Sequence, residues 1–383
     1  MDDIPPDIQH DELLDGASYA ERLEYFRDKL ENASGSPDTF LFVGHGCGLK
    51  VKNDALMLQQ GSAHGETVKP VLLYRGMHSI KRIVFLSTSG FTTIDALHWC
   101  KSQNIDLLVI DELGNLIYSL SPENEFSARL RRIQYRAGDT TDVALSIVRD
   151  LIRMKTVSQI DMLKTLAKYK HKRAFEEYRL GRIWSEPNWK ALETGLAELD
   201  LMTNIRMVLL HEARLAMIYW GEFIGVPIKW QSKDAKIVPP HWKRVTERFS
   251  SSSSGNTARR ATNPFHAALN YMYSVTEHQL LCAIHVEGLD PACGFLHADS
   301  DNRLSLVYDL IEPLRAVVDG RVFSFFNRET FSRGDFTPTN DGGVMFNPEL
   351  LRFLVASCKL DDSISGGMVS WFKESLLALS AQY

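Results

Sequence analysis

The sequence predicts an α+β protein in which a small, mostly β N-terminal domain precedes a larger all-α domain. Two patterns predict this division. Residues 39–122 contain short apolar runs bounded by glycine, asparagine and aspartate, which is typical of short strands. From residue 123 to residue 383, apolar residues recur at helical spacing instead. A length of 383 residues suits two such domains.

Residues 1–38 are predicted to be an acidic, helical N-terminal extension. They contain eleven Asp and Glu but only three Lys and Arg, a net charge of −8, whereas the whole chain carries −5. Leu23, Phe26 and Leu30 share one helical stripe, which predicts a helix that docks on another surface. The rest of the chain therefore carries +3, and its Lys and Arg clusters can attract phosphates or form solvated helix faces.

In the β domain, the strongest local signal is a hairpin. Residues 49–52 and 55–58 read as short strands around the turn pair Asn53-Asp54. Thr92 or Thr93 is expected to cap a helix that follows. Further strands are predicted at 40–43, 71–74, 83–86, 105–110 and 116–118. We expect no catalytic constellation in this domain, since the glycine run at 44–48 lacks the Gly-Lys-Ser/Thr of a phosphate loop.

The second domain is predicted to be helical up to its end. A polar interruption at 231–262 contains two prolines and a serine run, and such a long loop is usually functional or disordered. Asn263-Pro264 then opens a helix, with proline at its first position. The predicted helices are 127–137, 143–154, 158–181, 186–199, 203–223, one from 263 to about 274, 277–286, one from about 304, 347–357 and 368–380.

Two of these helices place acids beside apolar stripes. Asp309 and Glu312 are three residues apart and share a helix face. Glu212 lies within the apolar face of an earlier helix, where a carboxylate needs a partner or a raised pKa. That partner is either an arginine such as Arg214 or a metal ion shared with Asp309, Glu312 and His297. Carboxylates with one imidazole suit Mg²⁺ or Mn²⁺. The alternative is a solvated acidic face with an incidental loop histidine.

Four segments, in this order, resemble the CRISPR-associated integrase, the nuclease subunit of the spacer-acquisition complex. The resemblance spans about residues 39–380, and it implies a dimerisation domain at 39–122 and a catalytic domain at 123–383. The matching segments are 212–220 (Glu-Ala-Arg-Leu-Ala-Met-Ile-Tyr-Trp), 263–273 (beginning Asn-Pro-Phe-His-Ala), 288–297 (ending Gly-Phe-Leu-His) and 305–315 (Ser-Leu-Val-Tyr-Asp-Leu-Ile-Glu-Pro-Leu-Arg).

By this resemblance, Glu212, His297 and Glu312 are the metal ligands, and Asp309 is the accompanying catalytic acid. The implied cofactor is Mg²⁺ or Mn²⁺. The implied reaction inserts short DNA fragments (spacers) into a CRISPR array: a fragment 3′-hydroxyl attacks a phosphodiester at the edge of a repeat. With water as the nucleophile, the same site is an endonuclease. The residues expected to contact DNA are Arg315, Tyr219, Lys243, Arg244, Arg259, Arg260 and Asn270.

The resemblance also implies partners: double-stranded DNA, a second copy bound through the N-terminal domain, and a small ferredoxin-like CRISPR-associated protein. The sequence contains no apolar run long enough for a membrane span, no signal peptide pattern, and five scattered cysteines without a Cys-x-x-Cys pair. Together with the resemblance, these features lead us to expect that the protein acts in the cytoplasm of a prokaryote. His211 and His266 depart from the family pattern and could alter the pocket.

Three other functions stay open at this stage. One is a stand-alone or transposon-borne integrase of the same family, which would use the same chemistry. Another is a catalytically silent DNA-binding scaffold, although the presence of all four catalytic candidates argues against it. A small-molecule α/β enzyme is the weakest alternative, because the sequence has no cofactor fingerprint.

Overall fold

The computed structural model describes residues 39–43, 46–60, 69–86, 89–110, 116–120, 128–178, 188–247, 261–297, 303–340 and 342–380. The acidic extension at 1–38, the serine run at 250–254, and Arg259 and Arg260 lie outside these residues. The predicted domain boundaries near residues 38 and 122 also fall outside them and stay predictions.

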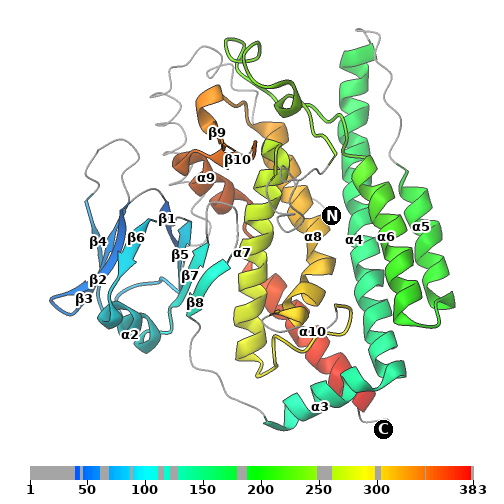
Figure 1. Cartoon of the computed structure of the whole chain (residues 1–383), viewed down its shortest axis with the longest axis horizontal. Coiled ribbons are helices and arrows are strands. Elements are labelled where there is room, and N and C mark those ends of the chain that lie inside the picture. The colour runs from blue at the N-terminus through cyan, green and yellow to red at the C-terminus, as the bar shows by residue number, and fades with distance from the viewer. Residues whose placement is uncertain are drawn as a thin grey trace.

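Two four-stranded sheets form the N-terminal domain (Figure 1). In the first, three parallel strands are followed by an antiparallel edge strand, in the order β1 (Thr39–Val43), β5 (Arg82–Leu86), β7 (Asp106–Ile110) and β8 (Leu116–Leu120). The second has the order β4 (Val71–Leu73), β3 (Ala55–Gln59), β2 (Cys47–Lys52) and β6 (Gly90–Thr92). Helix α2 (Ile94–Ser102) is capped by Thr93, as predicted, because its side chain accepts a hydrogen bond from the Ala96 amide at 3.3 Å.

The β2–β3 hairpin is the one that the sequence predicts. Lys52 pairs with Ala55, so Asn53 and Asp54 alone form the turn. Both have positive φ angles, 51° and 60°, which a two-residue hairpin turn of this type requires and which asparagine and aspartate tolerate. The turn chemistry therefore fixes the register of the two strands.

Helices build the second domain, which confirms the predicted α+β class (Figure 1). They are α3 (Ala128–Asp139), α4 (Thr141–Tyr178), α5 (Trp189–Glu198), α6 (Ile205–Gly221), α7 (Pro264–Val286), α8 (Ser305–Arg328), α9 (Pro348–Cys358) and α10 (Asp362–Ser380). Short 3₁₀ turns at Leu199–Leu201, Pro240–Trp242 and Arg333–Asp335, and a hairpin of β9 (Phe336–Pro338) and β10 (Val344–Phe346), complete it.

Two breaks predicted within helices are wrong, because α4 and α7 each run without interruption. Polar and β-branched residues near Thr156 and Thr276 suggest helix ends in the sequence. In the structure, the Thr156 hydroxyl donates to the Ile152 carbonyl at 2.8 Å, and the Thr276 hydroxyl donates to the Met272 carbonyl at 2.9 Å. Each hydroxyl is thus satisfied inside its own helix, and tertiary packing keeps both helices continuous.

Helices α4, α6 and α8 provide the frame of the candidate site. Helix α4 packs against both α8 and α6, and α7 packs on α8 (Figure 1). Helix α8 is buried over most of its length, and its acids Asp309, Glu312 and Asp319 are among its buried residues. No helix among the described residues is long and apolar enough to cross a membrane.

Candidate active site

Asp309 on α8 anchors the loop that carries His297. Its carboxylate is fully buried and accepts hydrogen bonds from the backbone amides of Phe295, Leu296 and His297, at 2.5, 2.9 and 3.0 Å. The His297 ring adds a contact of 2.7 Å between its Nδ1 and Asp309 Oδ1. Both carboxylate oxygens of Asp309 are therefore occupied by the loop.

Two further residues shape this loop. A Cβ on Gly294 would lie 2.6 Å from the Ser305 side chain and 3.1 Å from Asp309 Oδ2, so only glycine allows the loop this close to α8. Gln134 of α3 is completely buried, and its side chain binds the loop backbone. Its Nε2 donates to the Asp290 and Cys293 carbonyls, and its Oε1 accepts from the Asp290 backbone amide. The loop conformation is thus fixed from two sides.

The Asp309 contact also sets the tautomer of His297. Because a carboxylate can only accept, Nδ1 must donate its hydrogen to Asp309 Oδ1. The other ring nitrogen, Nε2, then carries the lone pair that a metal ligand needs. The His297 side chain is 28% exposed, so an ion can reach its ring from solvent.

The carboxylates of Glu212 and Glu312 meet around one ammonium group. Lys155 of α4 donates to Glu212 of α6 and, at 2.5 Å, to Glu312 Oε2 of α8. All three side chains are less than one-fifth exposed. The lysine therefore lies where a shared cation would neutralise both acids. Sequence reasoning missed Lys155, although a lysine in the buried stripe of α4 was the signal that could have found it.

Arg315 completes the charge balance. Its Nε donates to Glu312 Oε1 at 2.9 Å, and its guanidinium lies 4.6 Å from the centre of the Tyr273 ring. Burial alone would raise the pKa of Glu312, but the charges of Arg315 and Lys155 outweigh it and lower that pKa to about 2. Burial alone would lower the pKa of Lys155, but the carboxylates of Glu312 and Glu212 outweigh it and raise that pKa. Glu312 is thus stabilised as a carboxylate.

The donor set fits a divalent cation such as Mg²⁺ or Mn²⁺. Glu212 and Glu312 already share one cation, the Lys155 ammonium, and His297 can offer its Nε2 from the loop that Asp309 holds. In the described part of the chain, the ligand atoms of Glu212, His297 and Glu312 do not all come within 4.8 Å of one another. The structure therefore gathers the two glutamates around one ammonium group, with His297 on the loop that Asp309 holds.

The residues expected to contact DNA lie in different surroundings. Tyr219 is 1% exposed, and its hydroxyl donates to Asp319 Oδ2 at 2.7 Å, which makes it part of the core. Asn270 and Lys243 are half-buried, whereas Arg244 is exposed and donates to the Gly225 carbonyl. Arg315, as described above, pairs with Glu312.

The two histidines that depart from the family pattern contact backbone carbonyl groups. His211, beside Glu212, is 7% exposed, and its Nε2 contacts the Gly195 carbonyl of α5 at 2.8 Å. His266, at the start of α7, contacts the Thr246 carbonyl at 2.8 Å. Neither ring makes a hydrogen bond to Glu212, His297 or Glu312 in the described structure. They fix neighbouring elements of the pocket.

Residues 41–359 match the family model described as CRISPR associated protein Cas1. This match spans well over half of the chain. The chain belongs to the Cas1 family. One curated relative, the CRISPR-associated endonuclease Cas1 1 of Archaeoglobus fulgidus, is 26% identical over 286 residues, which are 73% of this chain and 75% of the relative.

Solved structures share the Cas1 fold. A casposase bound to an integration product superposes with a TM-score of 0.72 at 24% identity, over 90% of this chain and 91% of the casposase. A Cas6-RT-Cas1–Cas2 complex matches with a TM-score of 0.64 at 14% identity, over 91% of this chain and 36% of that one. Known structures of this fold therefore include one bound to an integration product and one in a complex with Cas2.

Proposed function

We propose that this Cas1-family chain is a metal-dependent DNA endonuclease and integrase that inserts short DNA fragments into a CRISPR array in the cytoplasm of a prokaryote. The observation that carries the proposal is the convergence of Glu212 and Glu312 on one shared cation, the Lys155 ammonium. His297, whose tautomer is set by Asp309, supplies the third candidate ligand. Endonuclease relatives and a casposase of the same fold support this activity.

In this proposal, three residues bind the metal ion and a fourth orients one of them. Glu212, Glu312 and the Nε2 atom of His297 would hold Mg²⁺ or Mn²⁺, and Asp309 would orient His297. When bound, the cation would polarise the attacked phosphodiester and stabilise charge on the leaving 3′-oxygen. Lys155 must then release at least one glutamate, because the ammonium and the cation need the same oxygens.

The proposed integration step is a transesterification. The 3′-hydroxyl oxygen of the fragment forms a bond to a target phosphorus, and the bond from that phosphorus to the target 3′-oxygen breaks. The hydroxyl proton leaves to water, and the released target strand ends in a new 3′-hydroxyl. With water as the nucleophile, the same bond breaks by hydrolysis, which accounts for integrase and endonuclease activities in one site.

The test is strand transfer of a labelled duplex into a supercoiled plasmid with Mn²⁺, comparing wild type with Glu212→Gln. Loss of one carboxylate ligand is expected to lower branched product by roughly 100-fold. The matched control is Glu193→Gln, because the Glu193 side chain is 47% exposed and pairs with Lys164 on the surface. Thermal melting checks that the variants fold.

The outcomes separate the alternative functions. Branched product that depends on Glu212 supports an integrase, whether it serves a CRISPR array or a mobile element. Nicking alone would indicate a nuclease without strand transfer. Unchanged product with Glu212→Gln would overturn the assignment of the metal site. Binding of DNA with no product under any condition would favour a silent scaffold.

An apolar face of the N-terminal domain supports the proposed homodimer. Among the described residues, four apolar side chains of this domain are 42–74% exposed: Phe91, Ile94, Ile117 and Tyr118. Phe91, Ile117 and Tyr118 line an apolar pocket of about 410 Å³. Exposed apolar patches of this kind mark protein interfaces. We expect Ile117→Asp to yield monomers in light scattering and Met77→Asp, an exposed site outside the pocket, to leave the mass unchanged. The ferredoxin-like partner would be sought by co-purification.

A further inference from the structure

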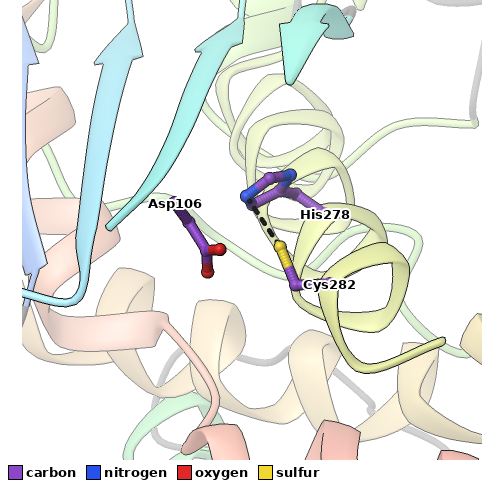
Figure 2. Close-up of side chains that lie close together, drawn as sticks. All are labelled: Asp106, His278 and Cys282. Atoms are coloured by element: carbon purple, nitrogen blue, oxygen red, sulfur yellow. Dashed lines mark hydrogen bonds between the residues drawn. The ribbon is translucent and has the colours of Figure 1, made fainter. Parts of the chain in front are cut away.

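A second cluster of chemically reactive side chains lies at the junction between the N-terminal sheet and the helical domain. Asp106, His278 and Cys282 point toward one another from β7 and α7 (Figure 2). All three are buried, with exposures of 7, 0 and 5%. One potential ligand atom from each lies within 4.8 Å of the other two. None of them belongs to the catalytic site described above.

The fold explains how these residues meet. His278 and Cys282 are four residues apart on α7 and therefore share one helix face. Asp106 is the first residue of β7, and β7 packs beside α7 (Figure 1). Two ligands at this helical spacing plus a third from a neighbouring element form a recurrent frame for zinc.

Second contacts orient Asp106 toward the cluster. Arg82 donates to Asp106 Oδ2 at 3.1 Å, and its other arm donates to Asp362 Oδ1 at 2.8 Å. The second oxygen, Asp106 Oδ1, is buried without a hydrogen-bond partner in the described structure, and so is His278 Nδ1. Burying a carboxylate oxygen unpaired costs free energy, which a cation bound to Asp106 Oδ1 would recover.

The charges and distances favour a divalent cation with affinity for sulfur. Arg82 and Asp362 cancel, so the Asp106 carboxylate and a Cys282 thiolate would together balance a 2+ ion. Cys282 Sγ lies 3.3 Å from His278 Nε2. Sulfur and nitrogen bound to tetrahedral zinc lie about 3.6 Å apart, given bonds of about 2.3 and 2.1 Å. Thiolate and imidazole select Zn²⁺ over Mg²⁺ or Mn²⁺.

We propose that Asp106, His278 and Cys282 form a structural Zn²⁺ site that fastens the N-terminal sheet to α7. Binding releases the Cys282 thiol proton to solvent, and the thiolate, the imidazole and the carboxylate each supply one bond. The described residues fill three of the four positions of tetrahedral zinc. This site is independent of the proposed function, because its ligands come from other elements than Glu212, His297 and Glu312.

The test uses the full-length protein and two metals. Zinc content is measured after incubation with Zn²⁺ and gel filtration, and Co²⁺ is bound separately to report on thiolate coordination by its near-ultraviolet charge-transfer absorption. We expect about one Zn²⁺ per chain and a thiolate band in wild type. Cys282→Ser, which is nearly isosteric, should lose the band and at least tenfold in Zn²⁺ affinity.

Two controls make the result specific. Cys358→Ser removes a buried thiol elsewhere and should keep the band, and Glu212→Gln should keep the zinc. If the Cys282→Ser protein does not fold, Asp106→Asn provides a second variant with the same expected loss of Zn²⁺ affinity. A wild-type protein that retains no Zn²⁺ and gives no thiolate band overturns the proposal. So does a band that persists in Cys282→Ser.

Discussion

Replacing Lys155 by methionine tests how the charges of the active site are balanced. Methionine keeps the length and apolar stem of lysine but removes its charge. In the metal-free protein, Glu212 and Glu312 would then be two neighbouring carboxylates with only Arg315 left to pair with Glu312. Removing one partner of a buried ion pair costs 3–5 kcal/mol, and the remaining Arg315 contact puts the expected cost at the lower end, about 3 kcal/mol.

The assay is thermal unfolding in EDTA and in a Mn²⁺ titration. A loss of about 3 kcal/mol corresponds to a fall in Tm of roughly 6–12 °C for a domain of this size. Mn²⁺ should restore most of it, because a ligand at about 100 times its Kd stabilises by about 2.7 kcal/mol. Without the competing ammonium, Lys155→Met should also bind Mn²⁺ roughly tenfold more tightly, a gain of about 1.4 kcal/mol.

Lys164→Met is the matched control on the same helix. Lys164 pairs with Glu193 at 3.3 Å, but both side chains are 47% exposed, so its removal should change stability by less than about 1 kcal/mol. The proposed role of Lys155 is wrong if Lys155→Met melts at the wild-type temperature in EDTA. It is also wrong if Mn²⁺ stabilises Lys155→Met and the wild type equally.

Three other predictions concern neighbouring residues. Asp309→Asn should weaken Mn²⁺ binding roughly 10- to 100-fold in calorimetry, because His297 loses its orienting carboxylate; unchanged affinity would contradict that role. The lowered pKa of Glu312, about 2 against 4.5, stabilises the fold by about 3 kcal/mol above pH 5, and this is lost as pH falls toward 2. Urea unfolding should show a smaller loss between pH 5 and 3 for Glu312→Gln. Tyr219→Phe should cost about 1.5–3 kcal/mol, since buried Asp319 loses a donor, yet leave DNA affinity in anisotropy unchanged; weaker DNA binding would restore the sequence expectation.

The sequence predicts elements well where local chemistry decides them. The Asn53-Asp54 turn, the Thr93 cap and the proline that opens α7 at Pro264 each use a residue type that fits one backbone position. The lengths of α4 and α7 were predicted wrongly because packing decides them. A polar or β-branched patch such as that around Thr156 reads as a break until the neighbouring helices are known.

The candidate site divides in the same way. Helix spacing and polarity already offered Glu212, His297, Asp309 and Glu312 as candidate metal ligands, but they left a solvated acidic face open as the alternative. Only the family resemblance favoured the metal site. Asp309 and Glu312 have the same spacing signal. The resemblance gives them different roles, and the structure gives them different contacts: Asp309 accepts from the His297 loop, whereas Glu312 pairs with Lys155 and Arg315. Lys155 is 57 residues from Glu212 and 157 from Glu312 along the chain, so no local pattern could assign it to both.

These contacts imply that metal binding is an exchange of cations. With Lys155 and Arg315 in place, two positive charges already balance Glu212 and Glu312. A divalent ion added to this set would leave two uncompensated positive charges in a buried site, so it must displace the ammonium or recruit an anion. A DNA phosphate is such an anion, and it would also accept hydrogen bonds from the released lysine. The site should therefore bind Mn²⁺ more tightly with DNA present than without it, and by reciprocity bind DNA more tightly with Mn²⁺.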